Sequence, residues 1–277
     1  MPTIRFQVEH ECSFIGSGRP VLQPDRHPGS IGKRGSAVMG ELTIMADGTV
    51  ALSGPHRSDP VLSGTLGRHV FHLGVDLGQA NDPSAFAVIE DKQLPLPEYD
   101  VAGRQLLGER QLAVVHLERL HGRDYTMIAR FIAAMTERAP LRGRVSTAID
   151  ATGVGRALTD LIREHGVTFT PVTITGGGSQ ARGDNGYYNV SKLLLLSELA
   201  AHLESGRLRI ANTPMGQELI AELNAFEVDY TASGTMKVDF RGKDYHGDLV
   251  VATALALWSA VGRPSGVIEV WRLEGWF

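Results

Sequence analysis

The run HVFHLGVDLG at residues 69–78 predicts an apolar strand, and from this point on the sequence becomes regular. A turn rich in Gly, Asn, Asp and Pro follows it. Two more strand-like runs come next, SAFAVIED at 84–91 and QLAVVHLERL at 111–120. Three consecutive strand runs with modest connections predict an antiparallel meander. We expect this meander to form the centre of the fold.

Helical and strand-like segments alternate after the meander. Asp124 is placed to cap a helix, VSTAID at 145–150 predicts a short buried strand, and residues 155–165 predict a second helix. TFTPVTI at 168–174 predicts the next strand. The order β-β-β-α-β-α-β predicts an α/β fold in which helices flank a mixed β-sheet.

The last hundred residues predict three helices and one hairpin. A glycine-rich loop over 176–186 precedes a helix over 192–204, and Thr213-Pro214 starts the next helix. The run at 226–240 predicts a hairpin. Residues 248–262, DLVVATALALWSAVG, are apolar on almost every side and predict a buried helix whose first residue is an acid, Asp248.

The N-terminal part has a different character, and we predict a boundary between a small β-rich extension, residues 1–66, and a main domain, residues 67–277. The Gly- and Pro-rich run at 16–36 predicts a loop. ELTIMADGTVALSG at 41–54 predicts a hairpin that turns at Asp47-Gly48.

Composition excludes several classes of protein. The 27 Lys and Arg residues against 31 Asp and Glu residues give a net charge of −4, so a globally basic coat for nucleic acid is excluded. The single cysteine, Cys12, leaves no intramolecular disulfide and no cysteine zinc site. The sequence has no signal peptide and no apolar run of bilayer length, so we expect a cytoplasmic protein without a membrane partner.

Three aspartates occur where apolar segments begin or end. Asp76 lies in the first strand of the meander, Asp150 ends the strand at 145–150, and Asp248 starts the last helix. Each alone is compatible with a turn or helix-cap role. If the three converge, they repel one another unless divalent cations lie between them, and hard oxygen ligands suit Mg²⁺ or Mn²⁺. Two such ions activate water and stabilise the leaving oxygen of a phosphodiester.

Three segments carry a family resemblance: GVDLGQANDPSAFAVIE at 74–90, AIDATGVGRALTDLI at 148–162 and HGDLVVATALALW at 246–258. In this order they resemble the nuclease motifs of bacteriophage terminase large subunits. The resemblance covers about residues 70–262. It implies a ribonuclease-H-like fold that cuts double-stranded DNA during genome packaging with two Mg²⁺ or Mn²⁺ ions.

The resemblance also implies partners, site residues and a location. The partners would be double-stranded DNA, a terminase ATPase, the small terminase subunit and the portal, in the host-cell cytoplasm. The metal ligands and catalytic residues would be Asp76, Asp150 and Asp248, and His246 and Asp82 would have auxiliary roles. The DNA-binding candidates are two basic residues, Arg182 in the glycine-rich loop and Lys192 at the start of a helix.

The sequence departs from the family pattern in two respects. The third motif of the family commonly carries an acid before and another after the position of Asp248, and Gly247 and Val251 stand there instead. No phosphate-binding loop is present: Gly32-Lys33 is followed by Arg34, and His27 stands where the first glycine belongs. We therefore expect an isolated nuclease domain or a stand-alone relative without a motor.

Other functions fit parts of the sequence. An ATP-binding protein of the actin and heat-shock-chaperone class also has loops like GVDLG and TGGGS, the latter at 175–179. A junction resolvase or a ribonuclease H shares the expected fold. A catalytically weakened DNA-binding packaging module agrees with Gly247, Val251 and the negative net charge.

Overall fold

The computed structural model describes residues 41–44, 50–53, 68–78, 82–101, 105–122, 124–153, 155–176, 178–183, 186–230, 236–240 and 247–262. The predicted loop at 16–36 lies outside these residues, and the boundary predicted after residue 66 remains a prediction. No helix within the described ranges is long and apolar enough to cross a membrane.

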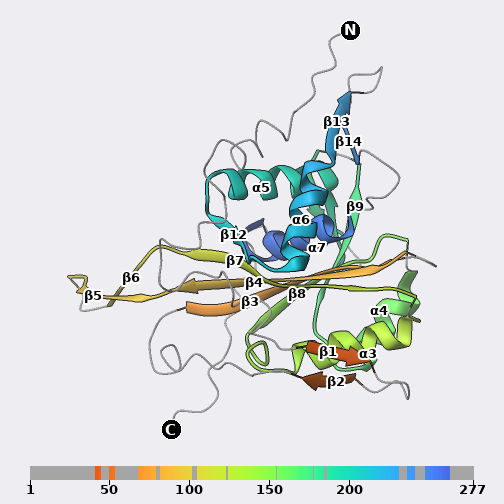
Figure 1. Cartoon of the computed structure of the whole chain (residues 1–277), viewed down its shortest axis with the longest axis horizontal. Coiled ribbons are helices and arrows are strands. Elements are labelled where there is room, and N and C mark those ends of the chain that lie inside the picture. Colours follow the sequence, from red (N-terminus) through yellow and green to blue (C-terminus); the bar gives the residue numbers. More distant parts are fainter. Residues whose placement is uncertain are drawn as a thin grey trace.

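A mixed sheet of eight strands forms the centre of the fold, in the order β10-β11-β9-β8-β3-β4-β7-β12 (Figure 1). The predicted meander is confirmed, because β3 pairs antiparallel with β4 and β4 with β7. β8, β9 and β11 continue from β3 as parallel neighbours. The strands are β3 (Arg68–Asp76), β4 (Ser84–Gln93), β7 (Gln111–Leu120), β8 (Val145–Asp150), β9 (Thr170–Thr175), β10 (Gln180–Arg182), β11 (Tyr188–Ser191) and β12 (Leu208–Ile210).

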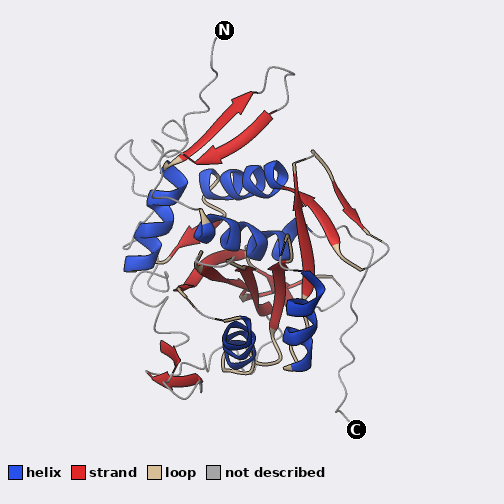
Figure 2. Ribbon diagram, turned by 90° about the vertical axis from the view of Figure 1, so that its right-hand side faces the viewer, coloured by secondary structure: helices blue, strands red, loops and turns tan. Residues whose placement is uncertain are grey.

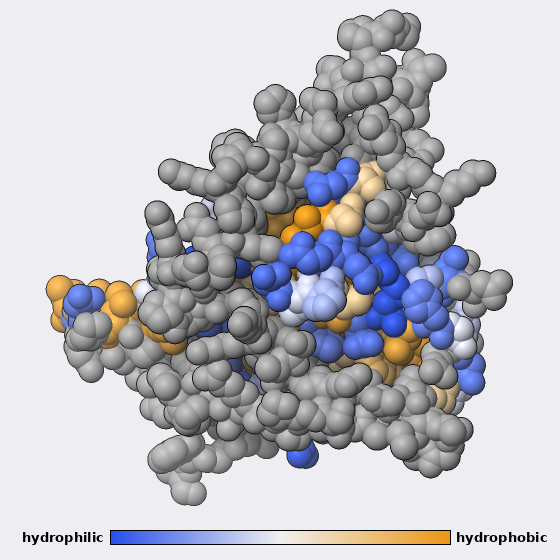
Figure 3. Space-filling model, viewed as in Figure 1, coloured by the Kyte–Doolittle hydropathy of each residue, from blue (hydrophilic) through white to orange (hydrophobic). Residues whose placement is uncertain are grey.

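Among the described residues, three two-stranded hairpins lie outside this sheet. Two of them were predicted and are confirmed: β1 (Glu41–Ile44) pairs with β2 (Val50–Ser53), and β13 (Phe226–Tyr230) pairs with β14 (Met236–Phe240). The third, β5 (Pro95–Tyr99) with β6 (Gln105–Leu107), was not predicted. It projects from the body of the protein and carries hydrophobic residues at its surface (Figure 3), and the exposed apolar side chains in or beside it are Leu94, Val101, Leu106 and Leu107.

Helices cover both faces of the sheet (Figure 2). On one face lie α3 (Tyr125–Thr136) and α4 (Gly155–Glu164), and on the other lie α5 (Lys192–Glu204), α6 (Pro214–Asn224) and α7 (Asp248–Leu257). The predicted caps of two helices are confirmed, because Asp124 accepts a hydrogen bond from the Met127 amide and Thr213 accepts one from the Gly216 amide. The predicted α/β fold with helices on a mixed sheet is therefore confirmed.

Two hydrophobic cores result, one on each face of the sheet. Alternate residues of β3 contribute to the core beneath α3 and α4, which contains Phe71, Leu73 and Val75. The core on the opposite face packs the alanine- and leucine-rich α7 against β4, β8 and α5. Gly74 allows α7 to approach β3 closely, since a Cβ atom on it would lie 1.9 Å from the Ala252 carbonyl oxygen.

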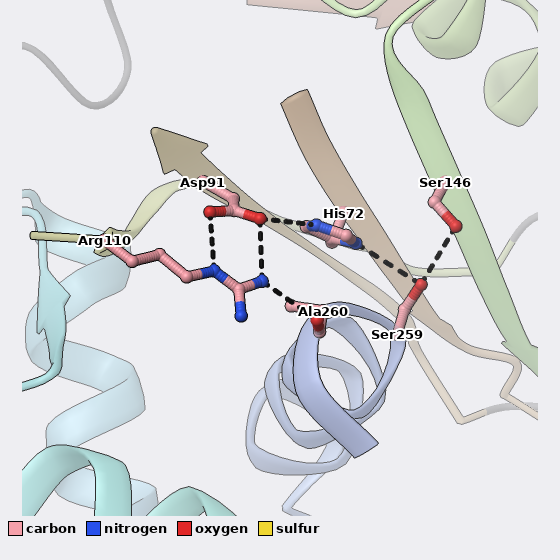
Figure 4. Close-up of polar contacts among 6 residues, drawn as sticks. All are labelled: His72, Asp91, Arg110, Ser146, Ser259 and Ala260. Atoms are coloured by element: carbon pink, nitrogen blue, oxygen red, sulfur yellow. Dashed lines mark hydrogen bonds and ion pairs between the residues drawn. The ribbon is translucent and has the colours of Figure 1, made fainter. Parts of the chain in front are cut away.

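The far end of α7 differs from the prediction of one helix over 248–262. The α-helix ends at Leu257, and residues Trp258–Gly262 form a π-helix, η2. Figure 4 shows how polar side chains anchor it: Arg110 binds Asp91 through two hydrogen bonds of 2.8 Å and donates to the Ala260 carbonyl at 2.9 Å. His72 lies between Asp91 and Ser259, with contacts of 3.3 and 3.5 Å. This network, buried at Asp91 and His72 and open to solvent at Arg110, fixes the C-terminal end of the helix to the sheet.

Candidate active site

Two of the predicted acids end neighbouring parallel strands. Asp76 is the last residue of β3 and Asp150 the last of β8, and Val75 is paired with Ile149 one position before them. Val75 and Ile149 face the core beneath α3 and α4. Because side chains alternate along a strand, Asp76 and Asp150 project from the opposite face, at the same edge of the sheet. Both aspartates are half-buried.

The third acid, Asp248, is the first residue of α7, the helix that lies across β3 and β4 on that face. A charge interaction links it to Asp76. Burial raises the pKa of Asp76 well above its ordinary value, and the negative charges of Asp150 and then Asp248 raise it further. Asp150 and Asp248, from two other parts of the chain, therefore lie within electrostatic range of Asp76.

Asp150 is held by the turn that follows it. Its carboxylate accepts a hydrogen bond of 2.8 Å from the Thr152 amide, and the Thr152 hydroxyl accepts one of 2.8 Å from the Ile174 amide on β9. Burial raises the pKa of Asp150, and the hydrogen bonds from Thr152 partly offset this rise. The turn thus fixes the direction of the carboxylate, and the pKa of Asp150 stays above its ordinary value because burial outweighs the hydrogen bonds.

Lys192 reaches the same edge of the sheet. β11 runs parallel to β9, so its last residue, Ser191, lies at the edge where β3 and β8 end, and Lys192 follows as the first residue of α5. The positive charge of Lys192 lowers the pKa of Asp76, against the effect of the acids. The Ser191 hydroxyl accepts a hydrogen bond from the Leu194 amide and so caps this helix.

The other predicted residues lie in the bend before β4, on the outermost strand of the sheet, or outside the described part of the chain. Asp82 is exposed in the bend that precedes β4. Arg182, expected in a loop, lies on β10, the outermost strand of the sheet, with its guanidinium 5.8 Å from the centre of the Tyr188 ring. β10 forms within the glycine-rich run because it pairs with β11. His246 lies outside the described residues.

The carboxylate oxygens of Asp76, Asp150 and Asp248 are the type of ligand that suits a hard divalent cation. Burial, followed by the charges of Asp150 and Asp248, raises the pKa of Asp76, and a bound hard cation would favour its ionised form. Among the described residues, no three His, Cys, Asp or Glu side chains form a ready-made metal cage. Mg²⁺ commonly takes only one or two protein carboxylates and completes its shell with water and substrate phosphate oxygens.

A fourth acid, Glu222 on α6, was not among the predicted site residues. It is buried, it forms an ion pair with Arg119, and one of its oxygens accepts hydrogen bonds from the Leu249 and Val250 amides at the start of α7. Burial raises the pKa of Glu222, Arg119 lowers it, and Asp248 raises it. Glu222 in turn raises the pKa of Asp76. In the sequence, Glu222 stands in an ordinary amphipathic helix, and no spacing marks it.

Comparisons with known proteins agree on one family. Residues 73–260 match the family model described as the terminase RNaseH-like domain. The large terminase subunit of Thermus virus P23-45 is 25% identical over 202 residues, and that of Thermus phage G20c is 24% identical over 202 residues. Each match covers 73% of this chain and 34% of the relative, so the chain spans about a third of their length.

For three solved structures of large terminase nucleases, the sequence identity is lower than for these two relatives. The large terminase nuclease of thermophilic phage G20c is 21% identical, with 83% of this chain and 97% of that chain covered and a TM-score of 0.49. The same nuclease with bound magnesium is 22% identical, with the same coverage and TM-score. The nuclease domain of the bacteriophage SPP1 large terminase with bound manganese is 15% identical, with 68% and 85% covered and a TM-score of 0.39.

Proposed function

This chain belongs to the terminase RNaseH-like domain family, and on that premise we propose that it is a metal-dependent endonuclease that hydrolyses phosphodiester bonds of double-stranded DNA. What supports the proposal is that Asp76 and Asp150 end neighbouring strands at one edge of the sheet, with Asp248 starting the helix that lies across that face. Burial raises the pKa of Asp76, and the negative charges of Asp150 and Asp248 raise it further. Carboxylates that raise the pKa of a neighbouring carboxylate in this way have a ready use as cation ligands.

In this proposal each group has a separate task. Asp76, Asp150 and Asp248 hold two Mg²⁺ or Mn²⁺ ions, which when bound supply an activated water and stabilise the leaving oxygen. Lys192 contacts the scissile strand through a phosphate, and Arg182 contacts the DNA farther along the sheet. His246 and Asp82 assist at the margin of the site. Gly247 and Val251 offer no additional acid, so the core ligands carry the metal chemistry.

From family membership we also propose the substrate, the location and the partners. The substrate would be packaging DNA in the host-cell cytoplasm. A terminase ATPase, the small subunit and the portal would be the partners.

The test is nicking of supercoiled plasmid by the purified protein in Mn²⁺, with EDTA as the metal-free arm and an RNA–DNA hybrid as a second substrate. Asp76→Asn, Asp150→Asn and Asp248→Asn remove charge but little volume, and we expect each to reduce nicking at least about a hundredfold. Asp160→Asn, an exposed carboxylate paired with Arg163, is the matched control and should cut normally.

Thermal unfolding in EDTA separates lost chemistry from lost fold. Because folding raises the pKa of Asp76, its carboxylate destabilises the metal-free protein at neutral pH, so Asp76→Asn should unfold at the same or a higher temperature. Plasmid nicking by all three variants at the wild-type rate would refute the assignment. Cleavage of the hybrid alone would replace it by a ribonuclease H function.

A further inference from the structure

Glu222 connects the sheet to the start of α7. Its side chain is only 4% exposed and lies between Arg119, on β7, and the first turn of α7. One carboxylate oxygen is paired with the Arg119 guanidinium. The other accepts hydrogen bonds of 3.1 and 3.2 Å from the amides of Leu249 and Val250. Glu222 thus joins two elements that are far apart in the sequence.

The first turn of α7 lacks a side-chain cap from its preceding residue, and Glu222 supplies the hydrogen-bond acceptor instead. The first amides of a helix have no partner within the helix, and a side chain at the preceding residue usually accepts from them. Gly247 occupies that position here, with φ of 72° and no side chain to accept a hydrogen bond. Glu222 supplies the acceptor from another helix, and its negative charge also suits the positive end of the helix dipole.

The other partner, Arg119, starts from the same row of the sheet as Asp76. Asp76 is paired with Ala85 on β4, and Ala85 is paired with Arg119 on β7. Directly paired residues of antiparallel strands place their side chains on the same face. A continuous chain of contacts therefore runs from the row that holds Asp76, through Arg119 and Glu222, to the helix whose first residue is Asp248.

We propose that Glu222, held by Arg119, is a positioning residue that fixes the first turn of α7 and thereby sets Asp248 against Asp76 and Asp150 for cation binding. The proposal rests on the proposed function of these three acids as metal ligands. Glu222 itself need not touch the metal. The opposite end of α7 is already anchored through Arg110 and Ala260, so loss of Glu222 frees the first turn in particular.

The test compares two glutamates of α6 that bind the same arginine. Glu218 accepts a hydrogen bond of 2.9 Å from Arg119, but its side chain is 52% exposed. Of these two glutamates, Glu222 has the described hydrogen bonds to α7, so Glu218→Gln is the matched control. Glu222→Ala removes the acceptor. Glu222→Gln keeps an oxygen that can accept from the α7 amides and loses the charged pair with Arg119.

Three measurements on each purified variant separate positioning from general stability: Mn²⁺ affinity by titration calorimetry, amide hydrogen exchange in the first turn of α7, and thermal unfolding. We expect Glu222→Ala to bind Mn²⁺ about tenfold more weakly, since loss of a group that orients a ligand commonly costs 10- to 100-fold in metal affinity. The α7 amides should exchange faster. Glu222→Gln should recover part of both effects, and Glu218→Gln should match the wild type.

The outcomes are distinguishable. Mn²⁺ affinity within about twofold of the wild type in Glu222→Ala, whatever its melting temperature, would overturn the positioning role. Equal losses in Glu222→Ala and Glu218→Gln would overturn it too, because the effect would then come from Arg119 alone. Hydrogen exchange needs neither metal nor DNA, so unchanged exchange at Leu249 and Val250 also counts against the proposal. A wild-type protein that neither binds Mn²⁺ nor cuts DNA would instead refute the proposed function.

Discussion

Replacing Gly74 by alanine tests whether the contact between β3 and α7 sets the geometry of the candidate active site. A Cβ atom at this position would lie 1.9 Å from the Ala252 carbonyl oxygen and 2.5 Å from the Ala256 amide nitrogen. Real Cβ atoms essentially never approach closer than 3.0 Å. Both obstructing atoms belong to the backbone of α7 and cannot rotate away. The helix must therefore move by about 1 Å or more, or β3 must bend.

The position of this contact sets the size of two expected effects, the loss of stability and the loss of nicking rate. Overpacking a close-packed interior costs about 1–3 kcal/mol, and we expect Gly74→Ala to lower the free energy of unfolding by about 3 kcal/mol because backbone must move. Ala252 lies one turn after Asp248, so the same displacement reaches the acid. A misplacement of about 1 Å in a reacting constellation costs about 100-fold in rate. Plasmid nicking should fall by that factor even where the variant is fully folded.

Urea unfolding and Mn²⁺-dependent nicking measure the two effects on the same preparations. Gly176→Ala is the control, because its Cβ atom would have no atom within 4 Å, and its stability should stay within about 0.5 kcal/mol of the wild type. A Gly74→Ala protein as stable and as active as the wild type would refute the reasoning. A destabilised but fully active variant would refute its second half, namely that α7 transmits the displacement to Asp248.

Two further predictions concern buried polar groups away from the acids. Burial lowers the pKa of His116 to about 4 in the folded protein, against 6.5 in the unfolded chain. The imidazole is therefore neutral in both the folded and the unfolded protein well above pH 6.5. As the pH falls from 6.5 toward 4, the unfolded chain takes up a proton that the folded protein does not, and stability is lost. The wild type should lose about 2 kcal/mol more stability than His116→Leu between pH 7.5 and pH 5, measured by urea unfolding, and equal losses would contradict this. Arg110→Met leaves the fully buried Asp91 without its bidentate partner and should lower the free energy of unfolding by about 3 kcal/mol. A loss below about 1 kcal/mol would show that the remaining partners of Asp91, His72 among them, satisfy its carboxylate.

The centre of the fold could be predicted from the sequence because its signals are local. β7 and β8 have the predicted limits, and the end of β3 differs from its prediction by two residues. The apolar runs are continuous there, and the elements that follow have strong start signals such as Asp124 and Thr213. Asp76, Asp150 and Asp248 could be singled out for a related reason, since an acid at the end of an apolar run is conspicuous.

The elements that could not be predicted depend on contacts made after folding. β12 has only three residues and forms as an edge strand parallel to β7, and β5 reads PLPEY, whose prolines argue against a strand. Trp258–Gly262 continues the apolar pattern of α7, so a change to π-helix leaves no mark in hydropathy. Glu222 pairs with an arginine 103 residues away. Its burial follows from how α6 packs beside α7, which no local window contains.

The start of α7 links the family departure at residue 247 to the role inferred for Glu222. A residue at φ of 72° is left-handed, which costs L-amino acids about 1–2 kcal/mol and glycine very little. Glycine therefore suits the entry turn, but it removes the side chain that would cap the helix. In this chain the missing cap is supplied from α6 by a carboxylate that is tied to the sheet through Arg119. An acid introduced as Gly247→Asp would add charge beside Asp248 but would strain the backbone. Glycine at position 247 avoids this strain, and in our proposal Glu222 replaces the missing cap and so holds Asp248 in place.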